Sequence, residues 1–411
     1  MPNEALNMAG PFQLLREGSY FRMWLTGLFV NTMKWLEILA VGVYVFDKTA
    51  SPFLVSLVLF CRLAPMMVFG AAIGALAERM NKKSILLSGL VLATLVSMTL
   101  GILLFTDKAE IWHIAVGGFL SGMLATMEFP IRRNIMGEVC GPERVGSGMA
   151  LDATTISITK LIGPVIGGIL LETIGLYGAF FLSTVLHILA IFSVVGLRYV
   201  ADIKTPTQKN VIGQIAEGIQ YIRTDRIILA VLGITIVINL LALPFASMVP
   251  VIGKGELGLS ASLIGVLASA EAAGMLVGCF FLATFKTQQF AKIYLVGSTL
   301  FLIFLILFSL SPWYTLSLAL LFLAGLGHAG FMVCQSTLLF TRSNPEVRGR
   351  VMGMLSMCIG LQPLGVLHIG LLADYFGGSN AVLIMTAEGL IAIGVCWILW
   401  PELRTLVVKP R

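Results

Sequence analysis

Long apolar runs, separated by short polar stretches, constrain the fold of this chain more than any other feature. Of its 411 residues, 58% are hydrophobic and only 12% are charged. About 20 consecutive apolar residues are enough for a helix to cross the hydrocarbon core of a bilayer. In that medium a helix also satisfies its own backbone hydrogen bonds. The sequence therefore predicts an all-α membrane protein.

Twelve such runs follow one another along the chain, and we expect each of them to be a transmembrane helix. Their ranges are 21–46, 53–77, 84–106, 111–137, 147–173, 177–197, 226–250, 259–284, 289–310, 315–340, 350–373 and 379–400. The longest polar interval falls between the sixth run and the seventh, so the chain divides into two groups of six spans.

This division predicts five parts. They are a cytoplasmic N-terminal segment (1–20), a six-helix bundle (21–197), a cytoplasmic linker (198–225), a second six-helix bundle (226–400) and a cytoplasmic tail (401–411). Apolar residues recur at helical spacing in the linker and predict an amphipathic helix on the membrane surface: Val211, Ile212, Ile215, Ile219 and Ile222.

Basic residues lie almost entirely on one side of the predicted membrane. Of the 27 Lys and Arg residues, 21 fall in the segments that are cytoplasmic if both termini are inside, and three (Lys48, Lys108 and Lys254) fall on the opposite side. Cytoplasmic loops carry such an excess of positive charge. We therefore expect a multi-pass protein of the inner (plasma) membrane with both termini in the cytoplasm. The net charge of +6 then reflects topology and does not indicate binding to nucleic acid.

The two halves of the chain also resemble each other. The segment Gly168–Gly175, at the end of the fifth run, matches Gly370–Gly377, at the end of the eleventh. Similarly, Pro142–Gly146 matches Pro345–Gly349 just before those two runs. The duplication predicts two pseudo-symmetric six-helix bundles. Repeats of this kind place a transport site at their interface near the membrane midplane.

A motif occupies the loop between the second and third runs, and it reads Gly74-Ala75-Leu76-Ala77-Glu78-Arg79-Met80-Asn81-Lys82-Lys83. It resembles the major facilitator superfamily signature G-x-x-x-D-R-x-G-R-R/K, with Glu78 in place of Asp and Asn81 in place of Gly. Because Asn tolerates a left-handed turn, we expect Asn81 to preserve the turn. The resemblance implies the major facilitator fold and a cytoplasmic gate containing Gly74, Glu78, Arg79 and Lys83. A plain basic loop is the alternative.

The fifth run contains a second motif, Gly163-Pro164-Val165-Ile166-Gly167-Gly168. It resembles the antiporter motif of the same superfamily, with Thr159 in place of the first Gly. Small residues let two helices approach closely, and a proline permits bending. The resemblance implies an exporter, and simple close packing of helices is the alternative. The residues expected to take part in the conformational change are Gly163, Pro164, Gly167, Gly168, Arg348 and Arg350.

Further segments narrow the resemblance to a branch that contains enterobactin exporters and macrolide efflux pumps. They are Trp35–Ala40, Thr49–Pro52, Arg62–Pro65, Ile215–Ile222, Arg348–Gly353 and Trp400–Arg404. This resemblance implies a secondary transporter that works by alternating access, but it does not name the solute. Lys34 departs from the branch, in which a small residue is usual at that position.

Charged residues inside the runs are the candidate site. Lys34 and Lys160 lie near the middle of their runs, where an unpaired charge costs at least about 2.5–3.5 kcal/mol. We expect them to face one cavity and hold an anionic solute, and structural ion pairs are the alternative. Lys34 and Glu37 are three residues apart and can partly neutralise each other. Glu37, Glu128 and Glu271 are candidates for proton coupling.

Uncharged and histidine side chains on the same runs are candidates for substrate binding. They are Asn31, Asn239, His328, Gln335 and Gln362. The sequence contains no motif for nucleotide binding, nucleophilic catalysis or metal coordination, so neither an enzyme nor a cofactor is expected.

The sequence thus predicts a monomeric secondary transporter that exports a small organic anion, such as a carboxylate siderophore, in a proton-coupled cycle. A multidrug or macrolide efflux pump is one alternative. A lysophospholipid flippase and a membrane sensor without transport are two others, because a fold alone does not fix an activity.

Overall fold

The computed structural model describes residues 11–77, 81–141, 144–197, 220–223, 225–284, 289–344 and 347–402. Within these ranges every regular element is a helix. Twelve helical segments are long and apolar enough to cross a membrane. The prediction of an all-α fold with twelve spans is therefore confirmed.

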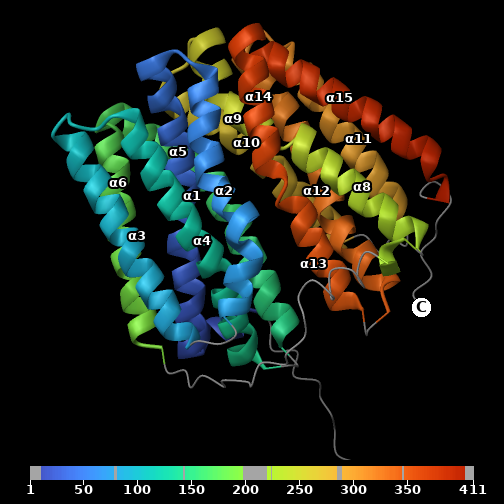
Figure 1. The fold of residues 1–411 in the computed structure, drawn as a ribbon, viewed down its shortest axis with the longest axis horizontal. Coiled ribbons are helices and arrows are strands. Elements are labelled where there is room, and N and C mark those ends of the chain that lie inside the picture. Colours follow the sequence, from blue (N-terminus) through green and yellow to red (C-terminus); the bar gives the residue numbers. More distant parts are fainter. Residues whose placement is uncertain are drawn as a thin grey trace, which may run out of the picture.

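The first half of the chain contributes six long helices, drawn from blue to green in Figure 1. After the short helix η1 (Pro11–Arg16) come α1 (Gly18–Thr49), α2 (Pro52–Ala77), α3 (Lys82–Phe105), α4 (Ile111–Cys140), α5 (Val145–Thr173) and α6 (Leu176–Val195). The helix α1 packs between α5 and α6, while α2 and α3 both pack on α4. Each helix follows the range of one predicted run.

The second half contains more elements because two of its predicted spans are broken. Its helices are α8 (Arg226–Leu241), α9 (Phe245–Val251), η2 (Ile252–Glu256), α10 (Ala261–Thr284), α11 (Phe290–Ser309), α12 (Tyr314–Arg342), α13 (Arg348–Ile359), α14 (Gln362–Phe376) and α15 (Gly378–Leu399). The seventh span thus consists of α8, α9 and η2, and the eleventh consists of α13 and α14.

Both breaks have a local cause. The amides of Ala242 and Leu243 both donate to the Ile238 carbonyl, at 3.0 and 2.9 Å, which ends α8. The next residue, Pro244, has no N–H with which to continue the ladder. At the other break, Gly360 and Leu361 separate α13 from α14, and Pro363 lies in the first turn of α14. The two breaks are neighbours, since α14 packs on both α8 and α9.

The two halves draw together at one end and diverge toward the other (Figure 1). Close packing joins α5 to α10 and α2 to α14. Two polar contacts between the halves lie at the closed end: Lys254 Nζ is 3.3 Å from Asp47 Oδ1, and the Ser262 amide donates to Glu172 Oε2 at 3.0 Å. By the positive-inside rule this closed end is predicted to face away from the cytoplasm.

The matching sequence segments occupy matching places in the fold. The helix α5 ends at Thr173 and is followed by Gly175, with φ +104°. The helix α14 ends at Phe376 and is followed by Gly377, with φ +85°. Only glycine adopts such positive φ values without strain. The duplicated glycines therefore perform the same turn in both halves.

Several predictions fall on residues that the structure does not describe. Most of the linker helix (211–219), the signature residues Glu78 and Arg79, and nearly all of the C-terminal tail lie outside the described ranges. The boundaries of the five predicted parts and the cytoplasmic position of both termini stay predictions.

Replacing Gly167 with alanine is expected to destabilise the protein, because the added Cβ would lie 2.5 Å from the Leu36 carbonyl oxygen of α1. Overpacking of this kind costs roughly 1–3 kcal/mol, so the thermal unfolding temperature in detergent should fall. Gly89→Ala in α3 is the matched control, since a Cβ there meets no atom within 4 Å. Equal unfolding temperatures for the two variants would contradict the close approach of α1 and α5.

Candidate functional site

Lys34 and Lys160 come together around one aromatic ring. The Nζ atom of Lys34 in α1 lies 5.2 Å from the centre of the Trp35 ring, and the Nζ atom of Lys160 in α5 lies 5.6 Å from it. A Cβ on Gly163 would lie 2.7 Å from the Trp35 Cβ, so the glycine allows α5 to approach α1 at this level. Two cations from different helices therefore share one neighbourhood.

Lys160 also joins the two halves of the molecule. Its Nζ lies 2.7 Å from Glu271 Oε2 in α10, and the other carboxylate oxygen bonds with His328 Nδ1 in α12. Glu271 and His328 have side chains only 4% exposed, whereas that of Lys160 is 20% exposed. A charge-assisted contact of this kind is strong in a medium of low polarity.

Glycines set the spacing of this ion-pair cluster. A Cβ on Gly265 in α10 would lie 2.5 Å from the Pro164 carbonyl oxygen in α5. A Cβ on Gly325 in α12 would lie 2.0 Å from the Glu271 carbonyl oxygen. The backbones therefore approach each other closely at these points, which brings Lys160, Glu271 and His328 within reach. His328 is further fixed by stacking on Phe301, with ring centres 4.8 Å apart.

Glu37 does not pair with Lys34, although the two lie three residues apart in α1. Its carboxylate lies 2.8 Å from Arg62 Nη1 in α2 and accepts a hydrogen bond from Ser183 Oγ in α6. The side chain is 3% exposed and is enclosed by these neighbouring helices. The expected neutralisation of Lys34 by Glu37 is therefore wrong, because the tertiary partner Arg62 is available to the carboxylate instead.

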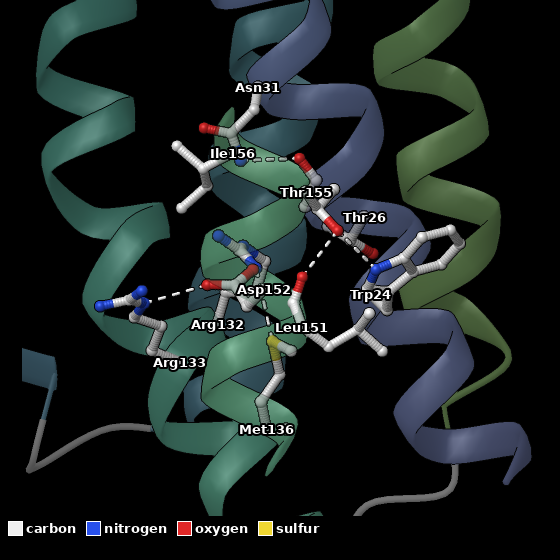
Figure 2. A network of polar contacts seen from close by, with 12 residues as sticks. Trp24, Thr26, Asn31, Arg132, Arg133, Met136, Leu151, Asp152, Thr155 and Ile156 are labelled. Carbon is white, nitrogen blue, oxygen red and sulfur yellow. Dashed lines mark hydrogen bonds and ion pairs between the residues drawn. The ribbon is translucent and has the colours of Figure 1, made fainter. Parts of the chain in front are cut away.

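Glu128 belongs to a charge network between α4 and α5, of which Figure 2 shows Arg132, Arg133 and Asp152. Arg132 is 0% exposed; its Nε lies 2.6 Å from Glu128 Oε1, and its Nη1 donates to Asp152 Oδ1. Arg133 Nε reaches the second oxygen of Asp152 at 3.0 Å. This network ties one turn of α4 to one turn of α5.

Sequence reasoning missed Asp152, which is 1% exposed and bonded to two arginines. The signal was present, since an acidic residue inside the predicted span 147–173 needs a partner. Room for Arg132 comes from Gly27 in α1, where a Cβ would lie 2.4 Å from the guanidinium. In the same region, Trp24 Nε1 donates to Thr155 Oγ1 at 2.7 Å, also shown in Figure 2.

The predicted polar ligands do not all reach the lysines. Asn31 Nδ2 donates to the Gly27 carbonyl at 2.8 Å, within its own helix. Asn239 Nδ2 donates to the Thr235 carbonyl at 2.9 Å, and Gln335 Nε2 donates to Thr235 Oγ1 at 2.6 Å. Asn239 and Gln335 therefore meet at Thr235, inside the second half, and not at the Lys160–Glu271 pair. Gln362 is half-buried at the first residue of α14.

The described part of the signature loop makes contacts within the first half. Lys83 Nζ donates to the carbonyls of Val195 and Leu197, at 3.1 and 2.8 Å, at the C-terminal end of α6. Asn81 caps α3 by accepting from the amides of Lys83 and Ser84, with φ −64°. The expectation of a left-handed turn at Asn81 is therefore wrong, because its side chain serves as an N-cap. Gly74 lies within α2.

The glycine motif of α5 contacts two helices at once. Gly163 and Gly167 face α1, and a Cβ on Gly168 would lie 2.2 Å from the Ala261 carbonyl oxygen at the start of α10. Pro164 lies inside the helix without ending it. In the second half, the Arg348 guanidinium lies 3.9 Å from the centre of the Phe340 ring, and Arg350 follows half-buried in α13.

Comparisons with known proteins agree with this architecture. Macrolide efflux protein A of Streptococcus pyogenes is 22% identical over 384 residues, covering 90% of this chain and 93% of that protein. The staphyloferrin A transporter of Staphylococcus aureus is 21% identical over 347 residues, covering 84% of this chain and 86% of that protein. The crystal structure of a mutant nucleoside transporter superposes with a TM-score of 0.72 over 93% of this chain and 99% of that one, at 11% identity.

The family comparison extends over almost the whole chain. The model of a family described as transmembrane secretion effectors matches residues 9–405. Together with twelve apolar helices, this match indicates a multi-pass membrane protein, which in bacteria is an inner-membrane protein, and an efflux or secretion transporter, not an enzyme. The chain belongs to the transmembrane secretion effector family of the major facilitator superfamily.

Proposed function

We propose that this transporter works as a monomer and exports a small organic anion, such as a carboxylate siderophore, in exchange for protons. The observation that carries the proposal is the ion pair between Lys160 of α5 and Glu271 of α10, which joins the two halves beside Lys34 and Trp35. The relative named as a staphyloferrin A transporter supports a siderophore as the solute.

Lys34 is the residue that favours an anion. It is half-buried, and it forms no salt bridge with a carboxylate of any residue that the structure describes. A buried cation without a counter-charge is unfavourable in a membrane. A carboxylate bound between Lys34 and Lys160 would supply that charge, while the Trp35 ring would pack against the apolar part of the solute.

The ion pair also suggests how protons and solute could be exchanged. Protonation of Glu271 removes its charge, and an anion bound to Lys160 competes with Glu271 for the ammonium group. Either event breaks the same contact between α5 and α10. We propose that the intact pair holds the halves closed at one end. Binding of either a proton or the anion is then enough to release them. Glu37 and Glu128 each pair with an arginine inside the first half, whereas Glu271 pairs with Lys160 across the two halves. We therefore assign the proton to Glu271.

The arrangement of the halves supports alternating access. They are joined at the end predicted to lie outside and diverge toward the end predicted to be cytoplasmic (Figure 1). We propose that this conformation receives the solute from the cytoplasm. In the outward-facing state the signature residues Glu78, Arg79 and Lys83 would then take part in closing the cytoplasmic end, with Arg348 and Arg350 opposite them.

A macrolide is the second candidate solute, because a relative named as a macrolide efflux protein is matched over 90% of this chain. In that case Glu271 would bind the cationic drug and the lysines would be structural. The two functions predict opposite effects of Lys34→Ala. Export of an anion would be lost, whereas export of a cationic macrolide would be unchanged or improved.

Comparing metabolites inside and outside cells, with and without the gene, tests the proposed solute class. Growth with ample iron and growth under iron starvation should be compared, and a carboxylate compound should accumulate inside the deletion strain. Movement of headgroup-labelled lysophospholipid in vesicles would instead indicate a flippase. Unchanged distribution of metabolites, drugs and lipids would indicate a protein without transport activity and would contradict the proposal.

Lys160→Ala is expected to reduce anion export by roughly tenfold or more, since a charge-assisted contact contributes about 1.5–3 kcal/mol. Export of the accumulated compound from cells is the measurement, with membrane expression and thermal unfolding as checks on folding. Lys108→Ala, at an exposed loop position, is the control and should retain full export. Normal export by a correctly folded Lys160→Ala variant would remove this lysine from the site.

Glu271→Gln should separate solute movement from proton movement, because the amide cannot bind or release a proton and no longer holds Lys160 as an ion pair. In reconstituted vesicles, downhill movement and solute exchange should persist, while a pH gradient should no longer drive accumulation. A protonophore should collapse accumulation in the wild type and have no effect in the variant. Accumulation that still responds to a pH gradient would exclude Glu271 as the proton carrier.

A further inference from the structure

A groove with a volume of about 470 Å³ lies along α10, α11 and α12, and neither Lys34 nor Lys160 lines it. Its floor contains four buried glycines: Gly278, Gly297, Gly327 and Gly330. Its walls carry apolar side chains that are exposed on the surface of the helix bundle, among them Phe281 (51% exposed), Val296 (41%) and Leu300 (39%). Exposed apolar side chains on membrane-spanning helices face the lipid.

The floor cannot be filled by larger side chains. A Cβ on Gly297 would lie 2.7 Å from the Gly327 carbonyl oxygen, and a Cβ on Gly327 would lie 2.7 Å from the Phe301 amide nitrogen. The backbones of α11 and α12 are therefore in contact beneath the groove. The same contact that packs the two helices leaves a depression on their outer surface.

The groove has a charge at one end only. Lys292, in the first turn of α11, is exposed and lines this end together with Gln289, while the remaining lining is glycine and apolar side chains. From Lys292 to Phe304 the helix rises by about 18 Å, at about 1.5 Å per residue. This length is close to one leaflet of a hydrocarbon core about 30 Å thick.

We propose that this groove binds an anionic phospholipid of the cytoplasmic leaflet, with an acyl chain along the glycine floor and the phosphate at Lys292. The cationic end of the groove falls at the membrane surface that the positive-inside rule predicts to be cytoplasmic, where anionic headgroups lie. The apolar part has the length of one chain. A second protein molecule could occupy the groove in the same way only if it placed an acidic group beside Lys292.

A bound lipid would contact the helices that hold the ion-pair cluster. Gly327 and Gly330 flank His328 on α12, and α10 carries both Gly278 and Glu271. The acyl chain would thus support α10, α11 and α12 from the outside at the level where His328 meets Glu271 on the inside. The site nevertheless stands apart from the proposed anion export, because neither Lys34 nor Lys160 lines the groove.

Native mass spectrometry of the full-length protein tests the site. Phosphatidylglycerol and phosphatidylethanolamine with identical acyl chains serve as the probes. The wild type should retain phosphatidylglycerol preferentially. Lys292→Gln should weaken that binding about fivefold and abolish the preference, as expected for one lysine near an anionic headgroup. Lys292→Arg should keep the preference, and Lys108→Gln, at an exposed lysine far along the chain, should behave as the wild type.

Leu300→Trp is the second test. Leu300 lies in the groove wall and is 39% exposed, so a larger tryptophan side chain should fill the groove without disturbing the core. It should reduce retention of both lipids. Unchanged retention of phosphatidylglycerol in either Lys292→Gln or Leu300→Trp would overturn the proposal. So would a protein dimer that retains no lipid and dissociates in Leu300→Trp, since the groove would then be an interface between two copies.

Discussion

A bilayer does not solvate charge, and most of the charges described inside the spans of this protein are paired with one another; Lys34 is the exception on which the proposed function rests. Arg62 meets Glu37, Arg132 meets Glu128 and Asp152, and Lys160 meets Glu271. The Arg132–Glu128 contact lies within α4, whereas the contacts of Arg62 with Glu37 and of Arg132 with Asp152 connect different helices of the first half. The Lys160–Glu271 pair differs, because it crosses between the halves. Breaking it therefore changes the interaction between the two halves.

Hydropathy was sufficient to predict the twelve spans and their grouping, because the length of an apolar run is fixed by the thickness of the membrane. The duplicated segments, ending at Gly175 and Gly377, predicted the internal symmetry. The interruptions after Leu241 and Ile359 were not predicted, since both runs remain long and mainly apolar across the break. Proline alone is a poor signal for them, because Pro130 and Pro164 lie inside continuous helices.

The candidate site was predicted only in part. A charge in an apolar run is visible in the sequence, so Lys34, Lys160 and Glu271 could be selected. Their partners depend on distances between helices, which local spacing does not provide. Spacing along α1 therefore favours Glu37 as the partner of Lys34, although Glu37 contacts Arg62. Asp152 belongs to no motif, and the two arginines that it contacts lie in another helix.

The interruptions in the seventh and eleventh spans make the two halves mechanically unequal. In the first half, α1 and α5 run unbroken from one membrane surface to the other. Their counterparts in the second half each have a joint at mid-depth, and the joints touch, since a Cβ on Gly365 would lie 2.1 Å from the Leu240 carbonyl oxygen. At these positions one half therefore has continuous helices and the other has jointed ones, and we refer to them as the stiff half and the compliant half. Bending during the transport cycle should be concentrated in the compliant half, with the stiff half acting as its frame.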